Sequence, residues 1–209
     1  MLINYLRKNY KDGEPIFLSD INVKGMTQEN IRYHLKKYTD EGLLSRFEPG
    51  IYYFPKDNQF GEKSVISAET VVYNKYICRK NVYVGYYSGH TFMNRIGLST
   101  QVPFIEEITS NYAPALVRKI TIKNRSYLIR KPVVKINENN MYTLQILDCL
   151  KSIGAFDEED IKSYGEVLSK HISEHKISKD DIDKYISNYP TKVYKAIYET
   201  GVNYVSSQW

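Results

Sequence analysis

One stretch of the chain, residues 16–54, constrains the fold most, because strand, turn and helix signals follow one another there in a fixed order. We predict a short strand, a short helix, a turn, a longer helix and two strands joined by a turn. The first strand is 15–17, the short helix is opened by Ser19 and Asp20, and the turn is 25–26. The longer helix starts at Thr27, and the last two strands, 43–47 and 51–54, are joined by a turn at 48–50. This order is typical of a winged helix-turn-helix.

The longer helix has defined ends and two different faces. Thr27 suits an N-cap, because its hydroxyl can accept from unpaired backbone N–H groups, and Gly42 stands where the helix would stop. Residues at helical spacing that should face the core are Ile31, His34, Leu35 and Tyr38. Residues left around the exposed side are Glu29, Arg32, Tyr33, Lys36 and Lys37. Such a helix can enter the major groove of DNA.

We therefore predict a DNA-binding face on this helix. Arg32 could read guanine and Gln28 adenine, whereas lysines suit phosphates better. The predicted DNA-binding residues are Thr27, Gln28, Arg32, Tyr33, Lys36, Lys37 and, in the wing, Arg46. The alternative is a protein-protein module, since the segment is nearly neutral and Asp40 and Glu41 end the helix. These acids lie away from the end of the helix that would meet the bases.

Charge is unevenly distributed along the 209 residues. The net charge is +5 overall, but +1 over residues 1–60, +8 over 61–135 and −4 over 136–209. A polyanion could therefore contact the middle of the chain as well as the N-terminus. The candidate second basic surface consists of Arg118, Lys119, Lys123, Arg125, Arg130 and Lys131. The alternative is a solvated basic surface offset by the acidic tail.

The remaining sequence predicts a second, mixed domain after a polar linker at 55–64. We expect an α+β fold in which a winged helix-turn-helix domain (residues 1–58) precedes an α/β domain with a helical C-terminal region (residues 62–209). A first helix should span 2–10. The second domain should contain helices at 68–78, 88–96, 139–153, 157–171, 178–186 and 191–204 and strands at 82–84, 103–108, 119–122 and 127–130.

Metal and disulfide chemistry is weakly indicated. Cys78 and Cys149 stand alone, without the spacing of a disulfide framework or a structural zinc site. His171 and His175 match the HxxEH spacing of inverzincin metalloproteases, but in the last stretch only Glu199 remains as a third ligand. We interpret this segment as a solvated helix face and expect no metal and no cofactor.

Other catalytic motifs are incomplete. Asp181 and Asp183 resemble a magnesium-binding acid pair but lie at a helix start, where they should serve as capping charge. Residues 88–90 (SGH) lack the GxSxG elbow, and the sequence contains no phosphate-binding GxxxxGK[ST] loop. We expect a protein that is not an enzyme. Short apolar runs and an N-terminus unlike a signal peptide predict a cytoplasmic protein that does not enter a membrane.

The chain resembles the AbiEi-type antitoxins of bacterial type IV toxin-antitoxin (abortive infection) systems. The segments that carry the resemblance are 26–32 (MTQENIR), 40–47 (DEGLLSRF), 49–55 (PGIYYFP), 85–89 (GYYSG), 97–103 (GLSTQVP) and 129–132 (IRKP). In combination they are fairly specific, and they cover residues 1 to about 135.

This resemblance implies an autorepressor that binds inverted repeats in promoter DNA through its winged helix, and a role in phage defence. It also implies an antitoxin whose C-terminal domain counteracts an AbiEii-like nucleotidyltransferase toxin, with direct contact left open. Two other function classes remain. One is an RNA-binding or RNA-processing protein that uses the basic middle, and the other is an interaction adaptor whose Tyr-rich C-terminal helices dock a partner.

Overall fold

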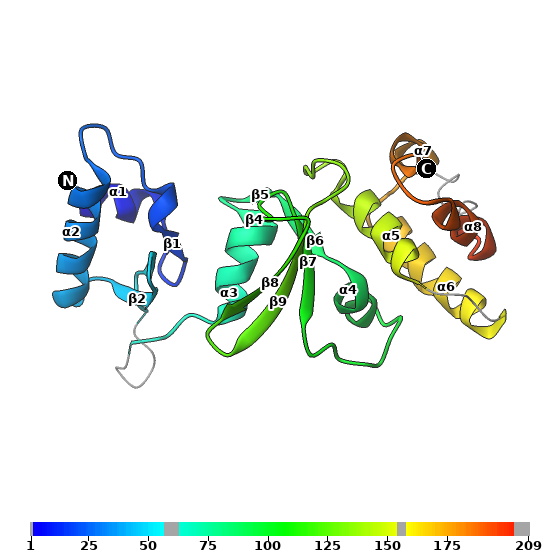
Figure 1. Ribbon diagram of the computed structural model, residues 1–209, viewed down its shortest axis with the longest axis horizontal. Helices are drawn as coiled ribbons and strands as arrows, with labels where there is room; N and C mark the ends of the chain where they lie inside the picture. The colour runs from blue at the N-terminus through cyan, green and yellow to red at the C-terminus, as the bar shows by residue number, and fades with distance from the viewer. Residues whose placement is uncertain (1, 57–62, 154–157, 203–209) are drawn as a thin grey trace. The chain divides into compact units, whose positions relative to one another are not determined.

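A computed structural model describes residues 2–56, 63–153 and 158–202, and it has a mixed α+β architecture (Figure 1). The chain divides into two compact units, Met1–Val71 and Val72–Trp209. Each unit has a hydrophobic core of its own. No helix in the described ranges is long and apolar enough to cross a membrane.

The first unit surrounds a small antiparallel sheet of strand order β1-β3-β2. Its elements are α1 (Leu2–Asn9), β1 (Ile16–Phe17), the 3-10 turn η1 (Leu18–Asp20), α2 (Gln28–Asp40), β2 (Ser45–Glu48) and β3 (Ile51–Tyr53). Leu6 of α1, Leu35 of α2 and Phe54 after β3 are fully buried in its core. The two long helices and the hairpin therefore pack around one shared apolar centre.

The ends of α2 follow from its sequence. The Thr27 hydroxyl accepts a hydrogen bond from the Asn30 N–H at 3.2 Å, which confirms the predicted N-cap. Gly42 has a φ of +73°, and the N–H groups of Leu43 and Leu44 both donate to the Tyr38 carbonyl. A residue without a Cβ adopts this left-handed conformation at little cost, so the helix ends there.

The short helix expected at Ser19 is only a 3-10 turn. Leu18 to Asp20 form a single turn, closed by the Ile21 N–H donating to the Leu18 carbonyl at 3.3 Å. The chain then becomes extended at Ile21, whose side chain is buried. Asn, Val and Gly in residues 22–25 are poor helix formers, which explains why the turn does not lengthen.

The second unit contains a mixed four-stranded sheet of order β6-β7-β9-β8. β7 pairs parallel with β9, and the other two pairs are antiparallel. The strands are β6 (Gly85–Tyr87), β7 (Glu106–Ser110), β8 (Val117–Ile122) and β9 (Arg125–Arg130), and a separate small hairpin joins β4 (Cys78–Arg79) to β5 (Val82–Tyr83). The sequence prediction missed β6 and placed β7 three residues early, because Pro103 and the exposed Phe104 precede the sheet.

Helices supply most of the core of the second unit. They are α4 (Gly89–Arg95), α5 (Met141–Ser152), α6 (Glu158–Glu174), α7 (Lys179–Ile186) and α8 (Thr191–Glu199). Of these, α5 is the central helix, because it contacts α4, α7, α8 and β6 (Figure 1). Its Leu144, Ile146, Leu147 and Cys149 are fully buried. The short helix α3 (Ala68–Val72), which continues as the π-helical turn η2 (Tyr73–Ile77), includes the boundary between the two units.

Several helix boundaries agree with the sequence prediction. Ser178 and Asp181 form a reciprocal capping box at the start of α7, so the capping role of this acid is confirmed. The predicted helix start at Asp157 and end at Tyr204, and most of the predicted linker (57–62), lie outside the described residues.

Candidate functional site

The exposed face of α2 carries the residues that the sequence analysis selected for DNA contact. Gln28, Arg32 and Lys36 follow one another at four-residue intervals, so they lie along one line of the helix. All three side chains are exposed, and the structure records no carboxylate within ion-pair distance of them among the described residues. The Tyr33 side chain beside this line is 66% exposed. The face offers uncompensated positive charge, amide groups and an aromatic ring.

Two of the predicted contacts are in different surroundings. Lys37 lies 3.8 Å from the Glu41 carboxylate on the same helix, an exposed pair that holds the lysine only weakly. Arg46 is exposed on β2, where it pairs with Tyr52 of β3 in the hairpin. On the inner side of α2, His34 is half-buried and stacks on Tyr38 with ring centroids 5.9 Å apart. The imidazole therefore contributes to packing.

The six basic residues of the second unit do not form one uniform surface. Arg118 and Lys119 are exposed on β8, and Lys123 occupies the turn between β8 and β9 with a φ of +52°. Arg125 lies 3.8 Å from the Glu106 carboxylate, and Arg130 lies 2.9 Å from that of Glu107. The last residue, Lys131, lines a cavity. Carboxylates of β7 thus offset part of the positive charge.

That cavity is a partly enclosed space with a largely polar lining. It has a volume of about 260 Å³ and lies between the sheet and the C-terminal helices. We call it the Ser88 cavity. It is lined by Ser88, Gly89, Glu107, Thr109, Arg130, Lys131, Val133, Asp148, Lys151, Ser152 and Lys192. Segments far apart in the sequence therefore bring four cationic side chains around one space.

Hydrogen bonds hold both acids of the Ser88 cavity. Arg130 donates from Nε and Nη2 to one oxygen of Glu107, at 3.1 and 2.9 Å, and the His90 N–H donates to the other at 3.3 Å. Asp148 accepts from the Tyr86 hydroxyl at 2.8 Å and from Thr109 at 3.3 Å. Burial nevertheless raises the pKa of the Asp148 carboxyl above its usual value, because it penalises the charged form.

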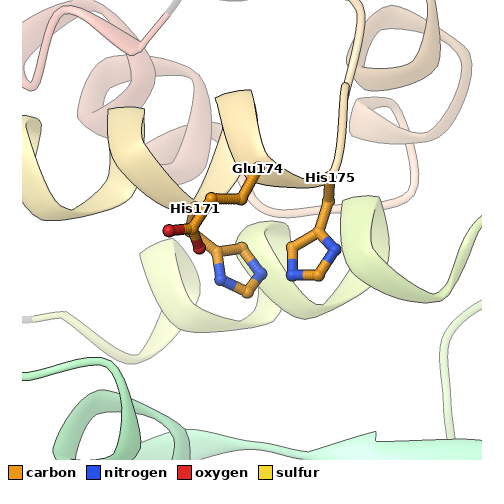
Figure 2. A group of neighbouring side chains, drawn as sticks. All are labelled: His171, Glu174 and His175. Carbon is orange, nitrogen blue, oxygen red and sulfur yellow. The ribbon is translucent and has the colours of Figure 1, made fainter.

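A second cluster lies at the end of α6. Figure 2 shows the imidazole rings of His171, in the last turn of α6, and His175, directly after the helix, side by side, with the Glu174 carboxylate close to His171. One potential ligand atom from each residue lies within 4.8 Å of the others. His171 packs edge-on against Phe92, and His175 stacks on Tyr142 with centroids 3.5 Å apart. The expectation of a solvated helix face is wrong for His171, which is buried.

Burial sets the protonation of this cluster. It lowers the pKa of His171 to about 4, with help from the neighbouring His175, and it lowers the pKa of His175 as well. Both imidazoles are thus neutral near pH 7. The His171 Nε2 atom is buried and has no hydrogen-bond partner among the described residues. Neutral imidazoles and a carboxylate are zinc ligands, but here all three come from five consecutive residues at the end of α6, and no other described residue joins the group.

The Ser88 cavity could not be predicted from the sequence. Lys151 and Lys192 lie in helices whose periodicity marks them only as exposed positions, and Ser88 was considered only as a nucleophile. Nothing in the local sequence relates these residues to Lys131. Only the tertiary packing of α5 and α8 next to β9 brings them together.

Two comparisons with known proteins bear on identity. No curated protein matches the chain in sequence. A family model described as a family of unknown function (DUF6088) matches residues 3–177, which includes α2, the sheet of the second unit and the His171 cluster. The match spans most of the 209 residues, so the chain belongs to the DUF6088 family.

Proposed function

We propose that this protein is a DNA-binding transcriptional autorepressor and the antitoxin of a type IV toxin-antitoxin system. On this proposal the first unit is a winged helix-turn-helix, α2 is its recognition helix, and the β2–β3 hairpin is its wing. The protein would bind inverted repeats in its own promoter and counteract a nucleotidyltransferase-like toxin without catalytic activity of its own.

The observation that carries the DNA-binding part is the composition of the exposed face of α2. Gln28, Arg32 and Lys36 are exposed along one line of a helix whose opposite face is fixed in the core. Arg and Gln side chains can make paired hydrogen bonds to guanine and adenine, and Lys can contact phosphate. Asp40 lies at the far end of the helix, where it would not repel the bases.

The antitoxin part rests on the sequence resemblance to AbiEi-type antitoxins. The second unit would be the part that acts on the toxin, either by contact or by another route. Cytoplasmic location and a role in phage defence belong to the same proposal. Palindromic operators are bound by two copies of a protein, so the active form on DNA would contain two chains.

Fluorescence anisotropy tests the DNA-binding part directly. The full chain is titrated against the duplex immediately upstream of its gene, against a shuffled duplex and against single-stranded RNA of the same sequence. We expect tight binding to the native duplex, weakening as salt rises. Arg32→Ala should lower affinity about 5- to 150-fold and relax specificity at one base position. Lys36→Gln should weaken binding to every duplex and reduce the salt slope by about one.

Lys8→Gln is a matched control, because Lys8 is exposed in the same unit but lies on α1. It should leave specific binding unchanged. Equal binding to native and shuffled duplexes, unaffected by Arg32→Ala, would contradict the proposal. A preference for RNA would instead favour an RNA-binding protein that uses the basic residues of the second unit.

The antitoxin part needs a separate test in cells. If the adjacent gene encodes a nucleotidyltransferase, its expression alone should arrest growth, and co-expression of this chain should restore growth. Restoration should persist in the Arg32→Ala variant when both genes are expressed from an unrelated promoter. Continued arrest in the presence of the native chain would contradict the antitoxin role.

A further inference from the structure

The Ser88 cavity is lined by four cationic side chains and by two carboxylates, Glu107 and Asp148, the second of which interacts electrostatically with Lys151. Lys131 follows β9, Lys151 lies near the end of α5, and Lys192 lies in the first turn of α8. None of the three has a carboxylate oxygen within 4.0 Å in the part of the chain that the structure describes. Three exposed lysines from separate elements thus line one space of about 260 Å³.

The acids of the Ser88 cavity already have partners. Glu107 is neutralised by Arg130, and Asp148 accepts hydrogen bonds from Tyr86 and Thr109. Since these carboxylates are engaged, a bound cation would have to displace their hydrogen bonds. It would also add its positive charge to that of the three lysines. The arrangement therefore favours an anion over a metal ion.

A buried hydroxyl provides an independent observation. Ser88 is 3% exposed, and its Oγ has no hydrogen-bond partner among the described residues. Buried polar atoms nearly always have a partner, so an unpaired one beside a cavity indicates a missing ligand or water. The Ser88 Oγ is itself covered in this structure, so its side chain would have to rotate towards the cavity before the hydroxyl could donate to an anion there.

We infer that the Ser88 cavity binds the phosphate group of a small phosphorylated ligand, with Lys131, Lys151 and Lys192 as its charged contacts and Ser88 as a hydroxyl donor. A tetrahedral phosphate presents oxygens in several directions, which suits lysines that approach from three elements. A carboxylate presents one charge and two oxygens. The cavity lies below the usual size of a pocket for a whole drug-sized ligand, so the rest of the ligand would extend outside.

Isothermal titration calorimetry of the full chain with inorganic phosphate, ATP, adenosine and acetate tests this inference. We expect phosphate and ATP to bind and adenosine and acetate not to bind. Equal affinities for phosphate and ATP would identify free phosphate as a sufficient ligand, and tighter binding of ATP would identify a nucleotide. Both results support the inference. Failure of both phosphate and ATP to bind at millimolar concentration would overturn it.

Matched charge variants locate the binding. The triple variant Lys131→Gln, Lys151→Gln, Lys192→Gln should weaken binding by roughly a hundredfold or more, because each charge-assisted hydrogen bond contributes about tenfold. The control triple variant Lys119→Gln, Lys135→Gln, Lys184→Gln removes the same charge from exposed lysines outside the cavity and should change affinity less than about threefold. Equal losses in both would show binding to general surface charge and overturn the inference.

Two milder variants keep the test valid if the triple variant does not fold. Lys192→Gln alone changes an exposed residue and should still weaken binding by about tenfold. Ser88→Ala should weaken it severalfold while circular dichroism stays native. Unchanged affinity in both, with native folding, would overturn the inference. Lys36→Gln on α2 should leave phosphate affinity unchanged, which separates this result from the proposed DNA binding.

Discussion

At the scale of single residues, two histidines that occupy equivalent positions in the HxxEH pattern differ in how deeply they are buried. His171 at the end of α6 and His175 just after it lie next to each other, yet His171 is 9% exposed with Phe92 and Tyr142 as neighbours, whereas His175 is half-buried. An imidazolium ion in such surroundings loses hydration without gaining a partner for Nε2. The native state therefore favours the neutral ring.

This protonation preference predicts acid sensitivity. The pKa of His171 is about 4 in the native state and about 6.5 in the unfolded chain. Between these values the unfolded state binds a proton that the native state does not, so protonation favours unfolding. The stability from neutral His171 is fully present above pH 6.5 and is lost as pH falls from 6.5 towards 4.

Urea unfolding at several pH values between 7.5 and 4.5 measures this effect. The native chain should lose more stability over this interval than His171→Phe, which keeps an aromatic ring but cannot titrate. His90→Phe replaces an exposed histidine and should retain the pH dependence of the native chain. A His171→Phe variant with the full native pH dependence would assign the acid sensitivity to other groups.

At the scale of elements, one glycine of α6 permits a close approach to Thr200, the C-cap residue of α8. A Cβ at Gly165 would lie 2.4 Å from the Thr200 carbonyl oxygen, which is backbone and cannot rotate away. Gly165→Ala should therefore destabilise the protein by about 1–3 kcal/mol through overpacking, despite the better helix propensity of alanine. Chemical denaturation measures the loss. Ser163→Ala, an exposed change on the same helix, should be within about 0.5 kcal/mol of native.

Elements with strong end signals were predictable from the sequence. Thr27 and Gly42 bound α2, and Ser178 with Asp181 starts α7, because caps satisfy backbone groups that a helix leaves unpaired. β6 was missed, since a three-residue strand carries little periodicity and depends on pairing with β7. The turn at Ser19 was overestimated, because the chain becomes extended at the buried Ile21 and the poor helix formers in residues 22–25 do not continue it.

The candidate sites differ in the same way. The exposed face of α2 could be predicted because all its residues lie on one helix, where periodicity alone separates the faces. The ion pairs that engage Arg125 and Arg130 could not, since each partner lies on a strand that only the sheet brings close. The Ser88 cavity depends on three separate elements and was likewise invisible in the sequence.

At the scale of the whole molecule, two hydrophobic cores of the described residues, one in each unit, have no member in common. One core contains Leu35 of α2 and other residues between positions 2 and 54, and the other contains Ile146 of α5 and residues between 86 and 202. Removing methyl groups from one core leaves the atoms of the other in place. A cavity created in one core should therefore destabilise mainly the unit that contains it.

Differential scanning calorimetry of two core variants tests this independence. Leu35→Ala and Ile146→Ala each truncate a side chain that is fully buried, so each should cost about 2–5 kcal/mol. In a unit of about 70 residues, such as the first, this corresponds to a fall in Tm of roughly 10 °C or more. We expect two unfolding transitions. Leu35→Ala should lower the Tm of one and Ile146→Ala the Tm of the other, and each variant should leave the second transition at its native Tm. If both variants instead shift a single transition as a whole, the two units unfold as one cooperative structure. In that case, effects on DNA binding from variants in the second unit would have to be corrected for the stability of the first.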